Sequence, residues 1–118
     1  MMPEPEKLYD TTILIQTHHA DQAFVKHMIS LFLEHIPHTN VDLEKACAES
    51  DWQKVYFYAH KMKASIDLFS LIKLKDLIRK IEQNAKNHVE IDSIPNDVKF
   101  VSAYIKNCIA QMKIDFDL

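Results

Sequence analysis

The chain contains no glycine in 118 residues, and this absence limits its possible folds and sites more than any other feature. Loops that hold nucleotide phosphates need residues that tolerate positive φ and let the backbone approach the ligand closely. A P-loop and a dinucleotide-binding fingerprint are therefore excluded. Together with only four prolines and a helical periodicity almost throughout, the absence of glycine indicates an all-α domain.

Apolar residues recur at alternating steps of three and four in three segments, which predicts three amphipathic helices. The first helix should be capped by Asp51 and end near Phe69, and Pro95 fits the first turn of the last helix after Ser93. Residues 87–94 form the one longer loop. The three stripes are Trp52, Val55, Ala59, Met62, Ile66 and Phe69; Leu71, Leu74, Ile78, Ile81 and Ala85; and Val98, Val101, Ile105, Cys108 and Met112.

The N-terminal part is predicted to hold three further helices. One runs from Asp10 to about Thr17, and a second is capped by Asp21 and stopped by Pro37. Thr39 or Asn40 caps the third, which reaches about residue 50. Short connections favour antiparallel neighbours, so we expect one domain over residues 1–118: an up-down-up-down four-helix bundle with a short N-terminal covering helix and a flexible tail at residues 1–9.

The composition, with 47% hydrophobic and 26% charged residues, is that of an ordinary globular domain. No apolar run approaches the roughly 20 residues needed to span a bilayer, and the N-terminus has no basic leader, so we expect a soluble, cytoplasmic protein without membrane contact. Cys47 and Cys108 lack partners at metal-binding or disulfide-framework spacing and are interpreted as free thiols. No metal site is expected from the other six histidines, His18, His19, His27, His35, His38 and His88.

His60 lies beside the apolar stripe of its helix, about a quarter-turn from the centre of that stripe. Its ring should therefore be at the solvent edge, where a group-transfer histidine has to be. Lys63 follows one turn later, where its ammonium can favour the neutral imidazole and then hold phosphoryl oxygens. Ala64 is small enough to leave the ring open to a partner.

The segment from Ala59 to Ser65 resembles the active-site helix of histidine-containing phosphotransfer domains, in which a histidine is followed by two residues, a lysine and a small residue. The resemblance covers about 90 residues. It includes residues 24–34, the Asp51–Trp52 pair and the Ile81–Glu82 pair. The family usually has glycine where this chain has Ala64 and Ser70; Ser70 is interpreted as a cap of the next helix.

The resemblance implies a phosphorelay intermediate. Nε2 of His60 would accept a phosphoryl group from the aspartyl phosphate of one receiver domain and pass it to another, the partners being a hybrid histidine kinase and a response regulator. Mg²⁺ would belong to the receiver, so the chain would need no cofactor and would be a phosphocarrier with no ATP site or turnover of its own. Glu82 is the candidate acceptor for the proton on Nδ1 of His60.

The charge distribution favours an acidic partner. The segment Trp52–Lys80 carries seven basic and two acidic residues, a net charge of +5, whereas the rest of the chain carries −8. This field would steer an acidic receiver pocket to His60. Nucleic-acid binding is disfavoured by the overall acidity. The predicted partner-binding residues are Tyr56, Ala64, Asp67 and Leu68, and a monomer is expected.

One alternative function remains open, and one further class of protein is disfavoured. A docking-only adaptor would bind receivers without carrying phosphate. Phosphorylation of His60 would distinguish a phosphorelay intermediate from such an adaptor. A dimerising histidine-kinase helix pair would need an acidic residue directly after the histidine and an attached ATP domain, but Lys61 follows His60.

Overall fold

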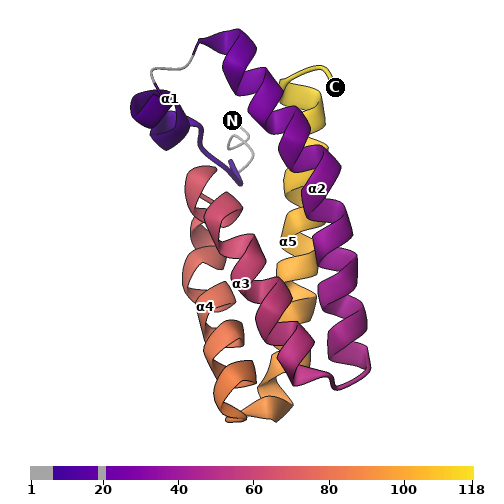
Figure 1. Ribbon diagram of the computed structural model, residues 1–118. Coiled ribbons are helices and arrows are strands. Elements are labelled where there is room, and N and C mark those ends of the chain that lie inside the picture. The colour runs from indigo at the N-terminus through magenta and orange to yellow at the C-terminus, as the bar shows by residue number, and fades with distance from the viewer. Residues whose placement is uncertain (1–6, 19–20) are drawn as a thin grey trace, which may run out of the picture.

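A computed structural model describes residues 7–18 and 21–118. The chain forms an antiparallel four-helix bundle, in which α2 to α5 run alternately in opposite directions (Figure 1). Helix α3 packs against α2 and α4, and α5 packs against the same two helices, which closes the bundle. The described residues contain no strand, and the predicted fold class is confirmed. The elements are α1 (Thr12–His18), α2 (Gln22–Ala48), α3 (Trp52–Leu68), α4 (Ile72–Asn87), the 3₁₀ helix η1 (Ile91–Ser93) and α5 (Ile94–Asp115).

The three predicted apolar stripes form most of the bundle core. Every residue of the α4 and α5 stripes is buried, and in the α3 stripe only Trp52 is partly exposed. Asp51 caps α3 by accepting a hydrogen bond from the backbone N–H of Lys54, and Pro95 lies in the first turn of α5. Ser93 precedes α5 without a side-chain cap bond, and η1 lies within the predicted loop at residues 87–94.

Helix α2 corrects the prediction for the N-terminal part. It continues through Pro37 instead of stopping there, and Thr39 and Asn40 lie inside the helix rather than capping a new one. A proline within a helix costs about 3 kcal/mol because it removes one backbone hydrogen bond and crowds the preceding turn. Here one buried stripe extends on both sides of it, through Phe32, Ile36 and Leu43. Each such side chain contributes about 1.5–3 kcal/mol when buried, so packing outweighs the cost.

This interpretation predicts that Pro37→Ala stabilises the protein by about 1–2 kcal/mol. The variant regains a backbone donor for the carbonyl of Leu33, and the larger conformational freedom of its unfolded chain offsets part of that gain. Urea unfolding followed by circular dichroism measures the difference, with a substitution at exposed Val41 in the same helix as control. A loss of stability would instead mean that the proline sets a bend that the packing of α2 requires.

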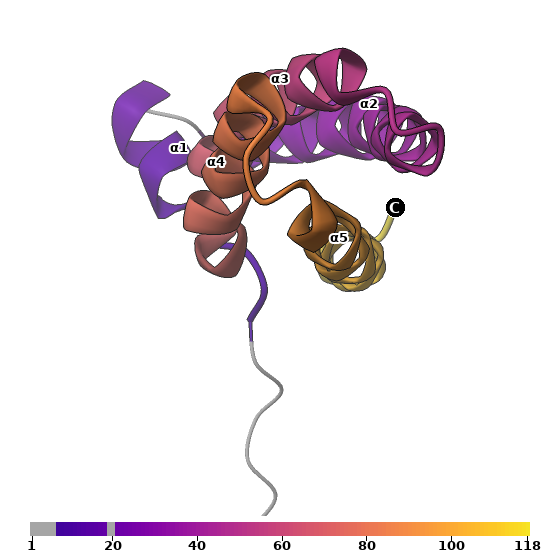
Figure 2. The same ribbon diagram turned by 90° about the horizontal axis from the view of Figure 1, so that it is seen from below.

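The segment before α2 covers one end of the bundle. Tyr9 and Leu14 are buried in the core, and the backbone N–H of Asp10 donates to the carbonyl of Phe69 at the turn between α3 and α4. Figures 1 and 2 show α1 beside the α3–α4 hairpin and away from α5. The predicted flexible tail at residues 1–9 extends too far, because Leu8 and Tyr9 are hydrogen-bonded to α5; residues 1–6 lie outside the described residues.

The turns show how the fold manages without glycine. Ser70 adopts a φ of 52° between α3 and α4, the left-handed conformation that glycine adopts most easily. Its predicted role as the cap of α4 is wrong, since Leu71 occupies the cap position and makes no side-chain cap bond. The cost of a left-handed non-glycine residue is about 1–2 kcal/mol. Ser70 thus makes this turn in the left-handed conformation without a glycine.

None of the helices in the described part of the chain combines the length and apolar character that a membrane crossing requires.

Candidate functional site

The candidate site lies on the outer surface where α3 faces α4. His60 is in the middle of α3, one position after the buried Ala59, and its side chain is 59% exposed, as the helical phase predicts. Nδ1 of the imidazole lies 2.6 Å from Oε2 of Glu82 on α4. The structure therefore brings together two of the residues that were predicted to share this site, from positions 22 residues apart.

The contact with Glu82 determines which nitrogen of His60 is available for chemistry. An ionised carboxylate has no proton to give, so Nδ1 carries the proton and donates the hydrogen bond. In the neutral ring, Nε2 then has its lone pair free. Glu82 is only 4% exposed, whereas the imidazole is open to solvent. The neighbouring helix thus holds one edge of the ring and leaves the rest of it accessible.

Lys63 completes the polar cluster from the next turn of α3. Its Nζ lies 3.1 Å from each carboxylate oxygen of Glu82. Burial raises the pKa of Glu82, but the hydrogen bonds and positive charges of Lys63 and His60 outweigh burial and hold the pKa below its ordinary value. The carboxylate is therefore ionised at neutral pH. Lys63 was predicted to lie on this face, but its ammonium is already bound by Glu82.

An aromatic ring and a second lysine lie on the other side of His60. The ring of Tyr56 is 5.9 Å from the imidazole, centroid to centroid, and Nζ of Lys86 lies 5.9 Å from the Tyr56 ring. Tyr56, one of the predicted partner-binding residues, is partly buried and packs against the core. Lys86 was missed by the sequence analysis; its position four residues after Glu82 was the available signal.

The other predicted partner-binding residues are exposed to different degrees. Ala64 is exposed one turn beyond His60. Leu68, in contrast, is partly buried and packs against the core. Ala64 thus remains available for contact with a partner, and a substitution of Leu68 would test packing as well as docking.

Asp67 forms an ion pair with Arg79, a residue that the sequence analysis did not single out. Its carboxylate oxygens accept hydrogen bonds from both terminal nitrogens of Arg79, at 2.6 and 3.2 Å. The hydrogen bond from the guanidinium lowers the pKa of Asp67. The pair links α3 to α4 one turn beyond Lys63, and both side chains are half-exposed. Sequence spacing alone did not reveal it, because it depends on the register between two helices.

The chain is similar to a known protein family. A family model described as the Hpt domain matches residues 27–114, which span α2 from its second turn to the last turn of α5. The chain belongs to the Hpt domain family. No protein of curated function and no solved structure gives a significant match.

Membership confirms the resemblance to histidine-containing phosphotransfer domains that the motif around His60 indicated. Hpt domains are phosphocarriers that act with receiver domains in two-component systems, and phosphotransfer is accordingly the general function of this chain. The matched region contains His60, Lys63 and Glu82. The individual roles of these residues remain predictions.

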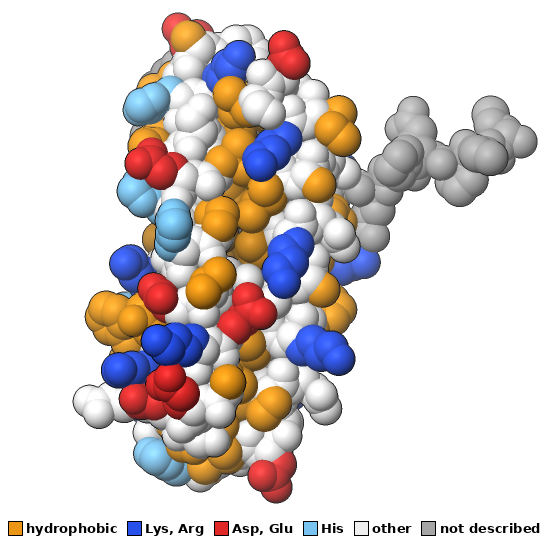
Figure 3. Space-filling view, turned by 90° about the vertical axis from the view of Figure 1, so that its right-hand side faces the viewer, with side chains coloured by type: hydrophobic (Ala, Val, Ile, Leu, Met, Phe, Trp, Pro, Cys, Tyr) orange, Lys and Arg blue, Asp and Glu red, His pale blue; other side chains and the backbone are white. Residues whose placement is uncertain are grey.

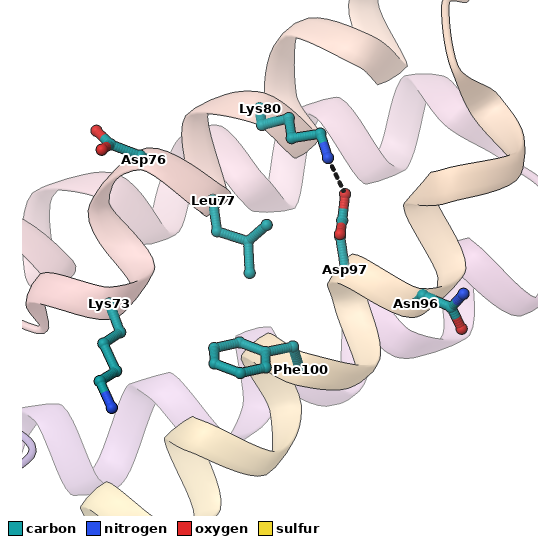
Figure 4. Close-up of a pocket in the computed structure, with 7 residues that line it drawn as sticks. All are labelled: Lys73, Asp76, Leu77, Lys80, Asn96, Asp97 and Phe100. Carbon is teal, nitrogen blue, oxygen red and sulfur yellow. Dashed lines mark ion pairs between the residues drawn. The ribbon is translucent and has the colours of Figure 1, made fainter.

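Two further surfaces of the Hpt domain do not include this site. The face formed by α2 and α5 carries interspersed basic, acidic and hydrophobic side chains (Figure 3). A groove of about 590 Å³ lies between α4 and α5. Leu77 and Phe100 line part of it and point toward each other (Figure 4). At its edge, Lys80 and Asp97 form an ion pair of 3.3 Å. None of the predicted site residues lines this groove.

Proposed function

We propose that His60 accepts a phosphoryl group from the aspartyl phosphate of a receiver domain and passes it to a second receiver domain. The observation that carries this proposal is the hydrogen bond between Nδ1 of His60 and the buried Glu82, which leaves the lone pair of Nε2 free in a side chain that is exposed to solvent. The donor would be the receiver of a hybrid histidine kinase and the acceptor that of a response regulator, in the cytoplasm. The chain would act as a monomer.

In the proposed step, the lone pair of Nε2 attacks the phosphorus atom while the bond from phosphorus to the aspartyl oxygen breaks. The aspartate leaves as a carboxylate, and the proton stays on Nδ1. The phosphorylated ring then carries a positive charge, which the ionised Glu82 stabilises at 2.6 Å. Phosphoryl transfer depends mainly on positioning and charge stabilisation, so a small site is sufficient.

Lys63 serves two purposes in this proposal. It neutralises part of the charge of the buried Glu82, and it lies one helical turn from the ring that receives the phosphoryl oxygens. The Mg²⁺ needed for the aspartyl phosphate belongs to the receiver, and the chain contributes no cofactor. The protein would thus act as a carrier, with no ATP site or autonomous turnover of its own.

The receiver is proposed to dock over the surface around His60. This surface combines Ala64, partly exposed aromatic and aliphatic groups from Tyr56 and Leu68, and the half-exposed Asp67 of the ion pair with Arg79. The surplus of basic residues between positions 52 and 80 would attract the acidic pocket of a receiver.

A transfer assay with phosphorylated receiver domains from the same genome tests the proposal. Mass spectrometry should locate an acid-labile, alkali-stable label on the peptide that contains His60, and the label should pass to a second receiver. Tight binding to receivers without any label would contradict the proposal and indicate the docking-only adaptor.

The role of Glu82 has its own expected result: Glu82→Ala should slow phosphoryl transfer about tenfold. This corresponds to the loss of one charge-assisted hydrogen bond of about 1.5 kcal/mol that favours the reactive tautomer and stabilises the phosphorylated ring. Rapid-quench measurement of transfer from a receiver checks the rate, and exposed Glu34→Ala on α2 is the control. Equal rates for Glu82→Ala and the wild type would remove the orienting role.

A further inference from the structure

Four charged side chains next to His60 form two ion pairs between α3 and α4. Lys63 pairs with Glu82, and Arg79 pairs with Asp67. The same four residues could pair within each helix instead, because Lys63 and Asp67 are four residues apart on α3, and Arg79 and Glu82 are three apart on α4. The observed arrangement is thus one of two possible pairings.

Arg79 makes Asp67 a poor competitor for Lys63. Its guanidinium spans both carboxylate oxygens of Asp67, a geometry that a lysine ammonium does not reproduce. Nη1 of Arg79 also donates to the backbone carbonyl of Lys75 at 2.9 Å, which holds the guanidinium against its own helix. Lys63 therefore pairs with Glu82, which is the buried one of the two carboxylates. A buried charge without a partner is the more costly of the two, so Glu82 gains more from the pairing.

We propose that the Arg79–Asp67 pair is a positioning device, which directs Lys63 onto Glu82 and thereby offsets part of the negative charge that faces Nδ1 of His60. The effect on transfer rests on the proposed function of His60, but the pairing of the charges does not. Arg79 and Asp67 are positioning residues here, since they act on the histidine through Lys63 and Glu82.

The charges around His60 explain how the position of Lys63 affects the imidazole ring. On α4, Glu82 faces the imidazole ring of His60, and Arg79 and Lys86 lie one turn before and one turn after Glu82. On α3, the neighbours of the ring are Tyr56, Lys61 and Lys63. Glu82 alone favours the imidazolium form, and Lys63 offsets that effect. If Lys63 moved to Asp67, this offset would be lost, and the uncompensated carboxylate would disfavour the neutral imidazole that the transfer step requires.

The test compares the wild type with Arg79→Gln, Asp67→Asn and the double variant Asp67→Asn/Arg79→Gln. The small donor phosphoramidate, whose P–N bond breaks with release of ammonia as the Nε2–P bond forms, reports on His60 without a receiver. For Arg79→Gln we expect a rate about three- to tenfold lower than that of the wild type at pH 6 and no loss at pH 9. In the double variant Lys63 has only Glu82 as a partner, so the wild-type profile with phosphoramidate should return; receivers are not used as donors for this comparison, because Asp67 belongs to the proposed docking surface.

Several results would overturn the proposal. A double variant as slow as Arg79→Gln, or an equal loss at pH 6 and pH 9, would mean that the pair only ties α3 to α4. A wild-type profile for Arg79→Gln would show that Lys63 does not depend on Arg79. Lys80→Gln is the matched control, because it removes one positive charge from the same helix on the side that faces Asp97. Histidine ¹⁵N NMR of the unphosphorylated proteins follows the protonation of His60 directly, so the pairing is tested even if no receiver phosphorylates the wild type.

Discussion

Replacement of His60 by glutamine is expected to abolish phosphoryl acceptance from every receiver domain and from phosphoramidate. The amide has no nitrogen lone pair that can attack phosphorus, whereas its NH₂ group can still donate a hydrogen bond to Glu82. The exposed position of the side chain means that the core is not disturbed. Circular dichroism should therefore show an intact bundle, and mass spectrometry should find no acid-labile label.

The control for this prediction is another exposed histidine. His38→Gln on α2 changes the same residue type away from the α3–α4 site and should keep the wild-type rate. Label that persists on His60→Gln would place the phosphoryl group on a different residue and contradict the proposed function. Binding of receivers to His60→Gln with wild-type affinity would separate docking from chemistry.

The features that sequence predicts well are those that depend on a single helix. The periodicity of Val55, Ala59, Met62 and Ile66 defines the buried face of α3 and therefore also places His60 outside it. The cap at Asp51 is equally local, because a carboxylate that accepts from Lys54 needs only the first turn of the helix. These features required no knowledge of the neighbouring helices.

The features that sequence did not predict depend on packing between helices. Pro37 is a helix-stopping signal locally, but the buried residues on both sides of it are packed in one continuous helix. Arg79 has no distinguishing pattern in the sequence, and its bond to Asp67 is set by the register of α4 against α3. The contact of Glu82 with His60 was predicted through the family resemblance rather than from spacing, for the same reason.

The second large effect is expected at Ala64, which lies one turn beyond His60 on the exposed side of α3. A tryptophan at this position places a bulky ring between the histidine and a docked receiver. Ala64→Trp should therefore lower the rate of transfer from a phosphorylated receiver about a hundredfold, since a displacement of about 1 Å between reacting groups is enough for a loss of this size.

The decisive comparison is between a large and a small phosphodonor. Phosphoramidate needs no docking surface, so Ala64→Trp should accept a phosphoryl group from it at a rate close to that of the wild type. Ala64→Ser, which keeps the side chain small, should retain normal transfer from receivers. A parallel loss with both donors would mean that the tryptophan disturbs His60 or Glu82 themselves, and normal transfer from receivers would place the docking surface elsewhere. If only the receiver reaction fails, the open space beside His60 is what admits the partner, and an alanine is sufficient where the family usually has glycine.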